Sequence, residues 1–310
     1  MPKVDSLIIG EGPAGVTAAL YLARSGCSVV LAEQMTTGGQ ILATSSLENY
    51  PGYPQGIKGY ELADLFAAHL QGLEHLERKS GAVTQVAGEA GNFTVTFQDK
   101  SVVSCRSVLV CSGAKHRKLG VEREEELTGH GVSYCALCDG NFFRGKPVAV
   151  VGGGNAALEE SLYLANIVDK IHLIHRRDTF RARKTYYDRL SAMGDKVVFH
   201  LDSQVTKLLG VKDLSAIGIS NLKTGAYEEV NVEAIFIYVG FEPVTTFLPE
   251  ELERDPQGFI VTDTEMRTNL PGIFAAGDIR SKLCRQVITA AGDGATAAQA
   301  AFVFLEQLHG

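Results

Sequence analysis

Two parts of the chain repeat the same order of apolar and amphipathic segments. In the first, the mainly apolar run 6–9 precedes a glycine-rich turn, apolar positions then recur with helical spacing over 16–23, and a second apolar run covers 29–32. In the second, an apolar run ends at Val151, a glycine-rich turn follows, and a second predicted strand covers 171–174. Short continuous apolar runs are typical of strands buried on both faces of a parallel sheet. The pattern therefore predicts two β-α-β units and an α/β fold.

The turn of the first unit has the spacing Gly-x-Gly-x-x-Gly, at Gly10, Gly12 and Gly15. In this motif the first glycine permits a tight turn, the second lets the backbone approach a diphosphate, and the third lets the helix pack closely on the strand. The helix that follows presents free N–H groups to the phosphates. Gly152 and Gly154 repeat the motif in the second unit, with alanine at the third position. Both units are therefore predicted to bind a dinucleotide.

The residue after the second strand differs between the units, although its spacing from the motif is the same. The first unit has Glu33, whose carboxylate can accept hydrogen bonds from a ribose hydroxyl. The second has His175, Arg176 and Arg177, with Arg181 shortly after. Guanidinium groups bind a 2′-phosphate through paired hydrogen bonds, whereas a carboxylate would repel it. The first site therefore suits FAD or NAD and the second suits NADP(H); the alternative for the arginines is a solvated basic surface.

Three residues beside the glycine motifs carry further expectations. Glu11 occupies the variable position of the first motif, and we expect its side chain to point to solvent, since its charge would repel phosphates. Gly26 suits the C-terminal stop of the first helix. Asn155 stands at the start of the second helix, and its side chain suits an N-cap.

The segments NFTVTF and SVVSCRSVLVCSGA alternate apolar and polar residues, as a small antiparallel meander does, and the last strand stops at Gly113. The second unit closes in a similar way, with a strand that stops at Gly240. Residues 116–245 are therefore predicted to form a complete dinucleotide domain inserted into a domain made of 1–115 and 246–310. The expected fold is two Rossmann-like domains of the three-layer ββα type.

The C-terminal segment returns to the first predicted domain with a buried strand, GIFAAGD, and a long helix. Asp278 lies at the carboxyl end of that strand, where ligands bind in open α/β sheets. A helix that starts near Arg285 would direct the positive end of its dipole at such a ligand. This segment is therefore expected to complete the first nucleotide site.

Size, charge and cysteine content narrow the class of protein. The chain has 310 residues, which suggests two domains, and a net charge of −7, which argues against nucleic acid or an anionic membrane as the main partner. It has no apolar run of the roughly 18 residues that a spanning helix needs and no signal-peptide pattern, so we expect a cytoplasmic protein. Six cysteines do not make a disulfide framework. Cys27, Cys105 and Cys111 lie in or beside apolar strands and are expected in the core, and Cys284 is also expected to be packed.

Cys135 and Cys138 form a Cys-x-x-Cys pair with Asp139 directly behind it. A closed zinc site takes four ligands, and only His130 stands close enough in the sequence to be a third candidate. A purely structural disulfide would stabilise little across so short a loop and is disfavoured in a reducing compartment. The spacing favours a reversible disulfide in which one thiolate exchanges and Asp139 acts as an acid–base group.

These motifs together resemble the low-molecular-weight (bacterial-type) thioredoxin reductases, which are FAD- and NADPH-dependent pyridine nucleotide-disulfide oxidoreductases. The resemblance covers the whole chain. It rests on the segments GEGPAG, TGGQI, LENYPG, YCALCDG, VVGGGNAALEE, HRRDTFRA, FIYVGFEP and GIFAAGDIRSKLCRQVITAAGDGATAA. This sequence departs from the family at two places: Leu137 lies inside the Cys-x-x-Cys pair, where a smaller residue is commoner, and Glu11 replaces a small residue.

The resemblance implies roles for residues at matching positions. Cys138 would face the flavin, Cys135 would attack the disulfide of the protein partner, and Asp139 would be the acid. The residues that would bind FAD are Gly10, Gly12, Pro13, Ala14, Glu33, Gln34, Gly39, Gln40, Asn49, Val83, Gly113, Asp278, Arg285, Gln286 and Val287. The residues that would bind NADPH are Gly152, Gly154, Asn155, Ala156, His175, Arg176, Arg177 and Arg181.

The resemblance further implies a cytoplasmic homodimer in which electrons pass from NADPH to FAD, to the Cys135–Cys138 disulfide, and to thioredoxin. One alternative is a flavin-dependent reductase of the same family with another protein disulfide partner or another electron donor, such as ferredoxin. The arginine pair argues against the ferredoxin-dependent relatives, which tend to lack it. A second alternative, from a different class, is a nucleotide-sensing module whose cysteine pair holds a metal ion.

Overall fold

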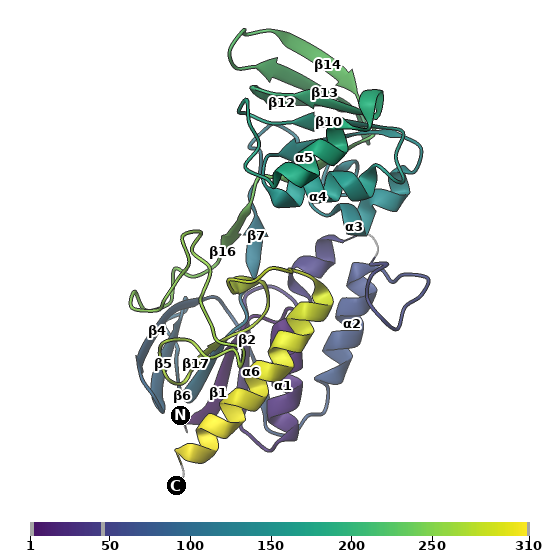
Figure 1. The fold of residues 1–310 in the computed structure, drawn as a ribbon. Helices are drawn as coiled ribbons and strands as arrows, with labels where there is room; N and C mark the ends of the chain where they lie inside the picture. The colour runs from purple at the N-terminus through teal and green to yellow at the C-terminus, as the bar shows by residue number, and fades with distance from the viewer. Residues whose placement is uncertain (1–2, 45–46, 309–310) are drawn as a thin grey trace. The chain divides into compact units, whose positions relative to one another are not determined.

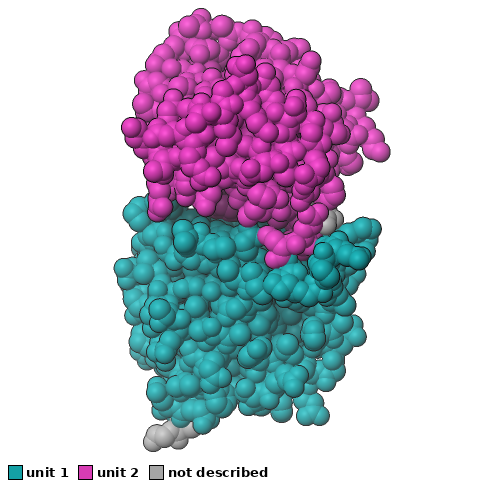
Figure 2. Space-filling view, turned by 45° about the vertical axis from the view of Figure 1, so that its right-hand side comes forward, with its two compact units in different colours: residues 1–43, 50–115, 242–310 teal, residues 44–49, 116–241 magenta. Residues whose placement is uncertain are grey.

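The computed structural model describes residues 3–44 and 47–308, which form two compact units (Figure 1; Figure 2). Unit 1 consists of Met1–Ala43, Tyr50–Lys115 and Glu242–Gly310, and unit 2 of Thr44–Asn49 and His116–Phe241. The ends of the predicted first domain, residues 1–2 and 309–310, lie outside the described residues. Each unit contains parallel strands that are covered by helices, and the predicted α/β fold class is confirmed.

Unit 1 contains a seven-stranded sheet in which strand β6 belongs to both a parallel and an antiparallel part. Near its carboxyl end β6 pairs in parallel with β1 and β17, so that Val108 lies opposite Leu7 and Ile273. Near its amino end it pairs antiparallel with β5, so that Cys105 lies opposite Phe93. The strands are β1 (Val4–Ile9), β2 (Val29–Glu33), β3 (Leu76–Ser80), β4 (Val83–Glu89), β5 (Asn92–Phe97), β6 (Val102–Val110) and β17 (Ile273–Ala275).

The apolar run in β1 is continuous because both faces of the strand are buried. Leu7 and Ile8 are each fully buried, yet they belong to different apolar clusters, since neighbouring side chains in a strand point to opposite faces. Ile8 packs in the cluster that includes Leu22 of the first helix, and Leu7 packs in the cluster that includes Phe97 of β5. The glycine loop that follows β1 is therefore anchored from both sides of the sheet.

The helices of unit 1 are α1 (Pro13–Arg24), α2 (Gly59–His69) and α6 (Val287–Gln307), with short 3-10 turns η1 (Gly39–Ala43) and η4 (Gly277–Ile279). Helix α1 has Pro13 at its first position, and the chain leaves it at Gly26, whose φ of 82° provides the expected stop. Helix α6 runs beside α1 (Figure 1), and the two approach closely at Gly294. A Cβ on Gly294 would lie 2.2 Å from the carbonyl oxygen of Ala14.

Among the described residues, α6 is the one helix that is long and apolar enough to cross a membrane by length and composition. Its buried residues are mostly alanines, and several of them share an apolar cluster with α1 and β1. A third of its most apolar stretch is buried, so packing inside unit 1 accounts for part of the apolar composition of this helix.

Unit 2 repeats the parallel sheet with the strand order β11-β10-β9-β15-β8 and carries a separate antiparallel sheet, β12-β13-β14. Its strands are β8 (Val132–Ser133), β9 (Pro147–Gly152), β10 (Lys170–Ile174), β11 (Val197–His200), β12 (Ser203–Gly210), β13 (Leu214–Asn221), β14 (Tyr227–Asn231) and β15 (Ala234–Tyr238). Its helices are α3 (Ala136–Asp139), α4 (Asn155–Leu164) and α5 (Lys184–Ser191), with 3-10 turns η2 (Gly140–Phe143) and η3 (Gly194–Lys196). Strands β7 (Ala114–His116) and β16 (Phe241–Pro243) form a two-stranded sheet of their own.

The close approach of α1 and α6 predicts opposite effects for two glycines of the same helix. We expect G294A to lower the free energy of unfolding by about 1–3 kcal/mol, because the added methyl group meets the Ala14 backbone. The control G292A adds a methyl group at a position with no atom within 4 Å, and helix propensity should raise the stability by up to about 1 kcal/mol. Calorimetric unfolding of the two variants tests this; equal effects at both positions would show that the helices separate readily.

Candidate active site and nucleotide sites

Cys135 and Cys138 are joined by a disulfide at the carboxyl edge of the unit 2 sheet. Strand β8 ends at Ser133, and Cys135 is the N-cap of the short helix α3. The sulfur of Cys135 accepts a hydrogen bond of 3.2 Å from the backbone N–H of Cys138. Cys135 is partly exposed and Cys138 is buried. A thiolate on Cys135 would therefore be the more accessible of the two and would be stabilised by this N–H group.

Asp139 is held in the same turn as the two sulfurs. Its Oδ2 accepts a hydrogen bond of 2.6 Å from the hydroxyl of Ser133, and that hydroxyl oxygen accepts the N–H of Cys135 at 3.2 Å. The backbone N–H of Asp139 also donates to the carbonyl of Cys135 at 3.1 Å. Ser133 thus fixes the carboxyl group relative to the cysteine turn, which suits an acid–base role for Asp139.

Two partly buried polar residues lie beneath this turn, and no motif in the sequence indicated them. The hydroxyl of Tyr238, on β15, accepts the N–H of Ala136 at 2.6 Å. Glu160, on α4, has a buried Oε2 without a hydrogen-bond partner in the described part of the chain. Burial raises the pKa of Glu160 to about 7, although a hydrogen bond from the Leu137 backbone opposes the rise. The signal that could have indicated Glu160 is a glutamate beside Ser161 and Leu162, the buried residues of an amphipathic helix.

The remaining cysteines belong to unit 1. Cys27, Cys105 and Cys111 are buried as predicted, and burial raises the pKa of Cys27 to about 11 and that of Cys105 to about 12. Cys284 is exposed, so the expectation that it is packed is wrong. It lies in the loop before α6, where the apolar residues next to it also face outward; Leu283 is fully exposed. Over residues 3–44 and 47–308, no three His, Cys, Asp or Glu side chains cluster closely enough to hold a metal ion.

The first glycine loop leaves an open space at the N-terminus of α1. Gly10 has a φ of 105°, and a Cβ there would lie 2.5 Å from the carbonyl oxygen of Cys111. Gly12 is the N-cap of α1 and has no side chain to cap it, and a Cβ on Gly12 would meet no atom within 4 Å. The first N–H groups of α1 are therefore available to an anion, as a diphosphate requires.

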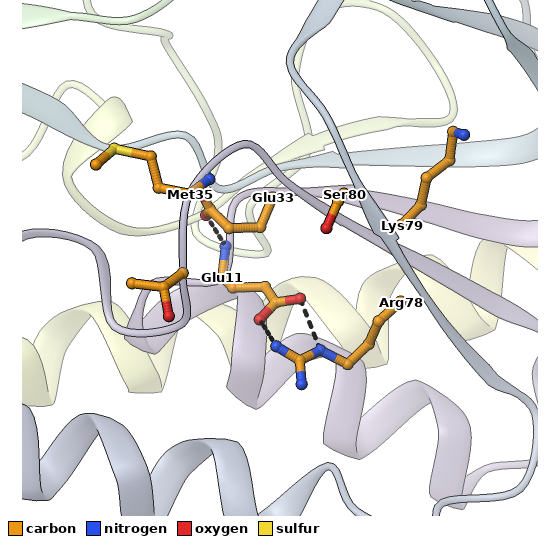
Figure 3. Close-up of a pocket in the computed structure, with 7 residues that line it drawn as sticks. Glu11, Glu33, Met35, Arg78, Lys79 and Ser80 are labelled. Atoms are coloured by element: carbon orange, nitrogen blue, oxygen red, sulfur yellow. Dashed lines mark hydrogen bonds and ion pairs between the residues drawn. The ribbon is translucent and has the colours of Figure 1, made fainter.

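Glu33 is fixed at the end of β2 by three backbone N–H groups. Its Oε2 accepts the N–H of Glu11 at 2.8 Å, and its Oε1 accepts the N–H groups of Gln34 at 2.9 Å and Met35 at 3.0 Å. A carboxylate has about four acceptor positions, so one position remains for a ribose hydroxyl. The residues around it form an open pocket of about 290 Å³ (Figure 3), which is lined by Glu11, Glu33, Met35, Thr36, Arg78, Lys79 and Ser80.

Glu11 does not point to solvent, so that expectation is wrong. The residue is 2% exposed, and its carboxylate makes a paired salt bridge with Arg78 of β3, with Nε–Oε1 at 3.0 Å and Nη2–Oε2 at 2.6 Å (Figure 3). Thr37 adds a hydroxyl hydrogen bond of 2.5 Å to the same carboxylate. The sequence pattern contains no sign of this pairing, because Arg78 is far from Glu11 along the chain.

Asp278 follows β17 and has a buried oxygen that suits a hydroxyl donor. Its Oδ1 lacks a hydrogen-bond partner among the described residues, since the Nζ of Lys282 is 3.7 Å away. Burial raises the pKa of Asp278, against the opposing charges of Lys282 and Arg285. Gln286 is the N-cap of α6 in a capping box with Thr289. A ribityl hydroxyl would satisfy the Asp278 oxygen.

The other residues predicted to bind FAD fall in different places. Gly39 begins η1 beside the glycine loop, and a Cβ there would lie 3.4 Å from the Cα of Gly12. Val83 begins β4, and Gly113 follows β6 with a φ of 66°. Asn49 belongs to the segment Thr44–Asn49 of unit 2, so unit 1 alone does not bring it together with the others. Pro13, Ala14, Gln34, Gln40, Arg285 and Val287 adjoin the residues already described.

The glycine loop of unit 2 also leaves a helix N-terminus uncapped. Gly154 is the N-cap of α4, no side chain caps the helix, and a Cβ on Gly154 would meet no atom within 4 Å. Asn155 does not cap the helix as expected; it is the first helical residue, and its Oδ1 accepts the N–H of Arg183 at 2.9 Å. Gly152 has a φ of 156° at the end of β9, and Ala156 is exposed in the first turn of α4.

His175 and the arginines follow β10. His175 is buried against the glycine loop, stacks on Phe180 with centroids 5.2 Å apart, and has an Nε2 without a hydrogen-bond partner in the described part of the chain. Burial and then the nearby guanidinium charges lower the pKa of His175. Arg176, Arg177 and Arg181 are exposed, and none of them forms a salt bridge within residues 3–44 and 47–308. Three exposed guanidinium groups that form no salt bridge among the described residues, and the Nε2 atom of His175, could together bind a phosphate monoester.

The two units place their functional residues at equivalent strand ends. In unit 1 the strand next to β6 is β17, which leads to Asp278, and in unit 2 the strand next to β15 is β8, which leads to Cys135. β6 and β15 are themselves equivalent, since each pairs in parallel with the strand of the glycine loop. The cysteine pair therefore occupies the position in unit 2 that Asp278 occupies in unit 1.

The buried carboxyl group predicts a pH-dependent stability that E160Q would remove. The pKa of Glu160 rises from 4.5 to about 7 on folding, so the folded protein keeps a proton that the unfolded chain releases across this window. The free energy of unfolding should therefore fall as the pH rises from about 4.5 to 7, by up to about 3 kcal/mol. Urea unfolding of the oxidised protein across this range measures the slope, with E159Q at the exposed neighbour as control. A slope that E160Q leaves unchanged would show that another group causes it.

Comparison with known proteins places the chain in a family. Residues 4–294 match the family described as pyridine nucleotide-disulphide oxidoreductase. A thioredoxin reductase of Listeria innocua is 43% identical over 307 residues, covering 98% of this chain and 94% of the relative, and one of Treponema pallidum is 41% identical over 311 residues, covering 98% of each. The crystal structure of thioredoxin reductase from Streptococcus pyogenes is 45% identical, with a TM-score of 0.90, over 98% of this chain and 99% of that one. The chain therefore belongs to the pyridine nucleotide-disulphide oxidoreductase family, and these relatives within the family are thioredoxin reductases.

Proposed function

We propose that the protein is a thioredoxin-disulfide reductase that uses NADPH and FAD. The observation that carries the proposal is the Cys135–Cys138 disulfide, held with Asp139 at the edge of a unit that also has an arginine-lined nucleotide loop. The relatives named thioredoxin reductase cover almost the whole chain, which supports the same reaction here. When bound, the flavin would relay two electrons from the nicotinamide to the disulfide.

Unit 1 would hold FAD and unit 2 would hold NADPH. In unit 1, the open N-terminus of α1 suits the diphosphate, Glu33 suits a ribose, and the buried oxygen of Asp278 suits the ribityl chain. In unit 2, the open N-terminus of α4 suits a diphosphate, and Arg176 and Arg177 suit the 2′-phosphate that distinguishes NADPH from NADH.

The reduced cysteine pair would transfer its electrons by thiol–disulfide exchange. The thiolate of Cys135 attacks one sulfur of the thioredoxin disulfide, which breaks that bond and forms a mixed disulfide with Cys135. The thiolate of Cys138 then attacks the Cys135 sulfur, which restores the Cys135–Cys138 bond and releases thioredoxin as a dithiol. Two electrons and two protons pass to thioredoxin, and Asp139, held by Ser133, is placed to move a proton at these sulfurs.

The second candidate is a reductase of the same family with another protein disulfide partner or electron donor. The exposed arginines favour NADPH as the donor, so this candidate would differ from the first in its protein partner. Leu137, inside the cysteine turn, is partly exposed beside Cys135 and would contact any protein that docks there. We further propose a homodimer in the cytoplasm, as the family resemblance implies.

Anaerobic titration tests the function directly. The purified protein should carry the long-wavelength absorption band of a flavin; NADPH should bleach the band, and oxidised thioredoxin should restore it with release of thioredoxin dithiol. C138S should still bind FAD and NADPH but should not pass electrons to thioredoxin, because the disulfide cannot form. A protein without flavin would contradict the function, and so would C138S that reduces thioredoxin at the wild-type rate. A flavin that NADPH bleaches and another protein disulfide reoxidises would favour the second candidate.

The arginines predict cofactor selectivity. R176Q/R177Q should raise the KM for NADPH by about 10- to 100-fold, because two charge-assisted contacts to a phosphate are lost. The KM for NADH should change by less than about 2-fold, since NADH has no 2′-phosphate. R183Q, at another exposed arginine near the same loop, is the matched control and should resemble the wild type. Equal losses for both nucleotides would show that Arg176 and Arg177 do not bind the phosphate.

A further inference from the structure

The salt bridge between Glu11 and Arg78 has no part in the proposed reaction, yet it lies in the wall of the first nucleotide pocket (Figure 3). Glu11 comes from the glycine loop, Arg78 from β3, and Thr37 from the loop after β2. The three side chains bond to one another: Arg78 donates to Glu11 through both Nε and Nη2, and Nη2 also donates to the Thr37 hydroxyl at 2.8 Å. Each of the three side chains is therefore hydrogen-bonded to the other two.

The cluster joins the segments that shape the pocket. The N–H of Glu11 donates to Glu33, and the carbonyl of Glu11 accepts the N–H of Gly38 at 2.8 Å. The next residue, Gly39, lies against Gly12. The backbone of Glu11 is therefore tied to the acid that would bind the ribose and to the loop beside Gly12, and its side chain is tied to β3.

The two charged side chains of the pair differ in their exposure to solvent. The side chain of Glu11 is 3% exposed and that of Arg78 is 49% exposed. Removal of Arg78 would leave a buried carboxylate without its counter-ion, close to the helix N-terminus that would hold a diphosphate, whereas removal of Glu11 would leave a solvated guanidinium. An unpaired acid there would repel the phosphates of the ligand and draw on the same N–H groups.

We propose that Arg78 is a positioning residue for the FAD diphosphate in this chain: through Glu11 and Thr37 it neutralises the acid in the glycine loop and holds the loop in its anion-binding form. The inference rests on the proposed function, because it takes FAD as the ligand of unit 1. The competing interpretation is that the salt bridge contributes to folding stability alone, in which case FAD affinity would not follow the charge of the pair.

The experiment measures FAD affinity of the holoenzyme by ultrafiltration at serial dilution, with free FAD determined in the filtrate. R78M should weaken FAD binding by about 10- to 100-fold. E11S/R78M, which removes both charges, should bind FAD more tightly than R78M and within about 3-fold of E11S, so the second change rescues the first. R78K keeps the charge without the paired hydrogen bonds and should lie between R78M and the wild type.

R24M is the matched control. Arg24 is an exposed residue of the last turn of α1, at the opposite end of that helix from the N-terminus that would hold the diphosphate. R24M should change FAD affinity by less than about 2-fold. NADPH affinity reports on unit 2 and should be the same in all these variants, which distinguishes a local effect from general unfolding.

Each of the following results would overturn the inference. R78M with wild-type FAD affinity would show that Arg78 does not position the ligand. A double variant as weak as R78M would show that the charge of Glu11 is not the cause. If R78M did not fold, R78K with wild-type FAD affinity would show that the paired hydrogen bonds of Arg78 do not hold the loop in its anion-binding form. A wild type that binds no FAD would overturn the proposed function and this inference with it, whereas unaffected variants of a flavin-containing wild type would overturn the inference alone.

Discussion

Parallel strand pairing is the constraint on which both sites depend. Strands that run the same way end at the same edge of a sheet, and their connections must cross over through helices that start at that edge. In unit 1 this brings the glycine loop after β1, Glu33 after β2 and Asp278 after β17 to one edge. In unit 2 it does the same for the glycine loop, His175 with its arginines, and the cysteine turn. A helix N-terminus without a side-chain cap faces each edge, which suits both edges to binding an anion.

Buried polar groups divide into two kinds that mark different roles. Glu11 is fully paired, by Arg78 and Thr37, and its burial is part of the scaffold. Asp278, His175 and Glu160 each have a buried polar atom that no described residue satisfies. Such an atom costs about 1–3 kcal/mol in a folded protein unless a ligand, a water molecule or a proton compensates it. All three lie at the edges where ligands or thiols are expected, so their unsatisfied atoms are consistent with sites that something else completes.

The sequence was sufficient for features that depend on neighbours along the chain. The apolar run 6–9 became the buried part of β1, Gly26 ended α1, and the spacing of Cys135 and Cys138 allowed a disulfide. The sequence was insufficient where the position of a side chain depends on a residue far away along the chain. Glu11 is buried because an arginine on β3 lies beside it, and nothing in the glycine motif indicates that arginine. Glu160 and Tyr238 meet the cysteine turn only because α4 and β15 fold beneath it. Asn155 was misassigned for the same reason, since the Arg183 backbone takes its side chain.

One helix, α4, links the nucleotide loop of unit 2 with its cysteine turn. The N-terminus of α4 is the uncapped end at Gly154 that would bind a diphosphate, and two turns later the same helix carries Glu160 beneath the cysteine turn. The backbone of Leu137 donates a hydrogen bond to the Glu160 carboxylate, so the helix that begins at the nucleotide loop also contacts the cysteine turn. Cys135 is partly exposed, which thiol–disulfide exchange requires. Its turn is held by residues of the same unit: Ser133 and Tyr238 accept backbone N–H groups of the turn, and α4 lies beneath it.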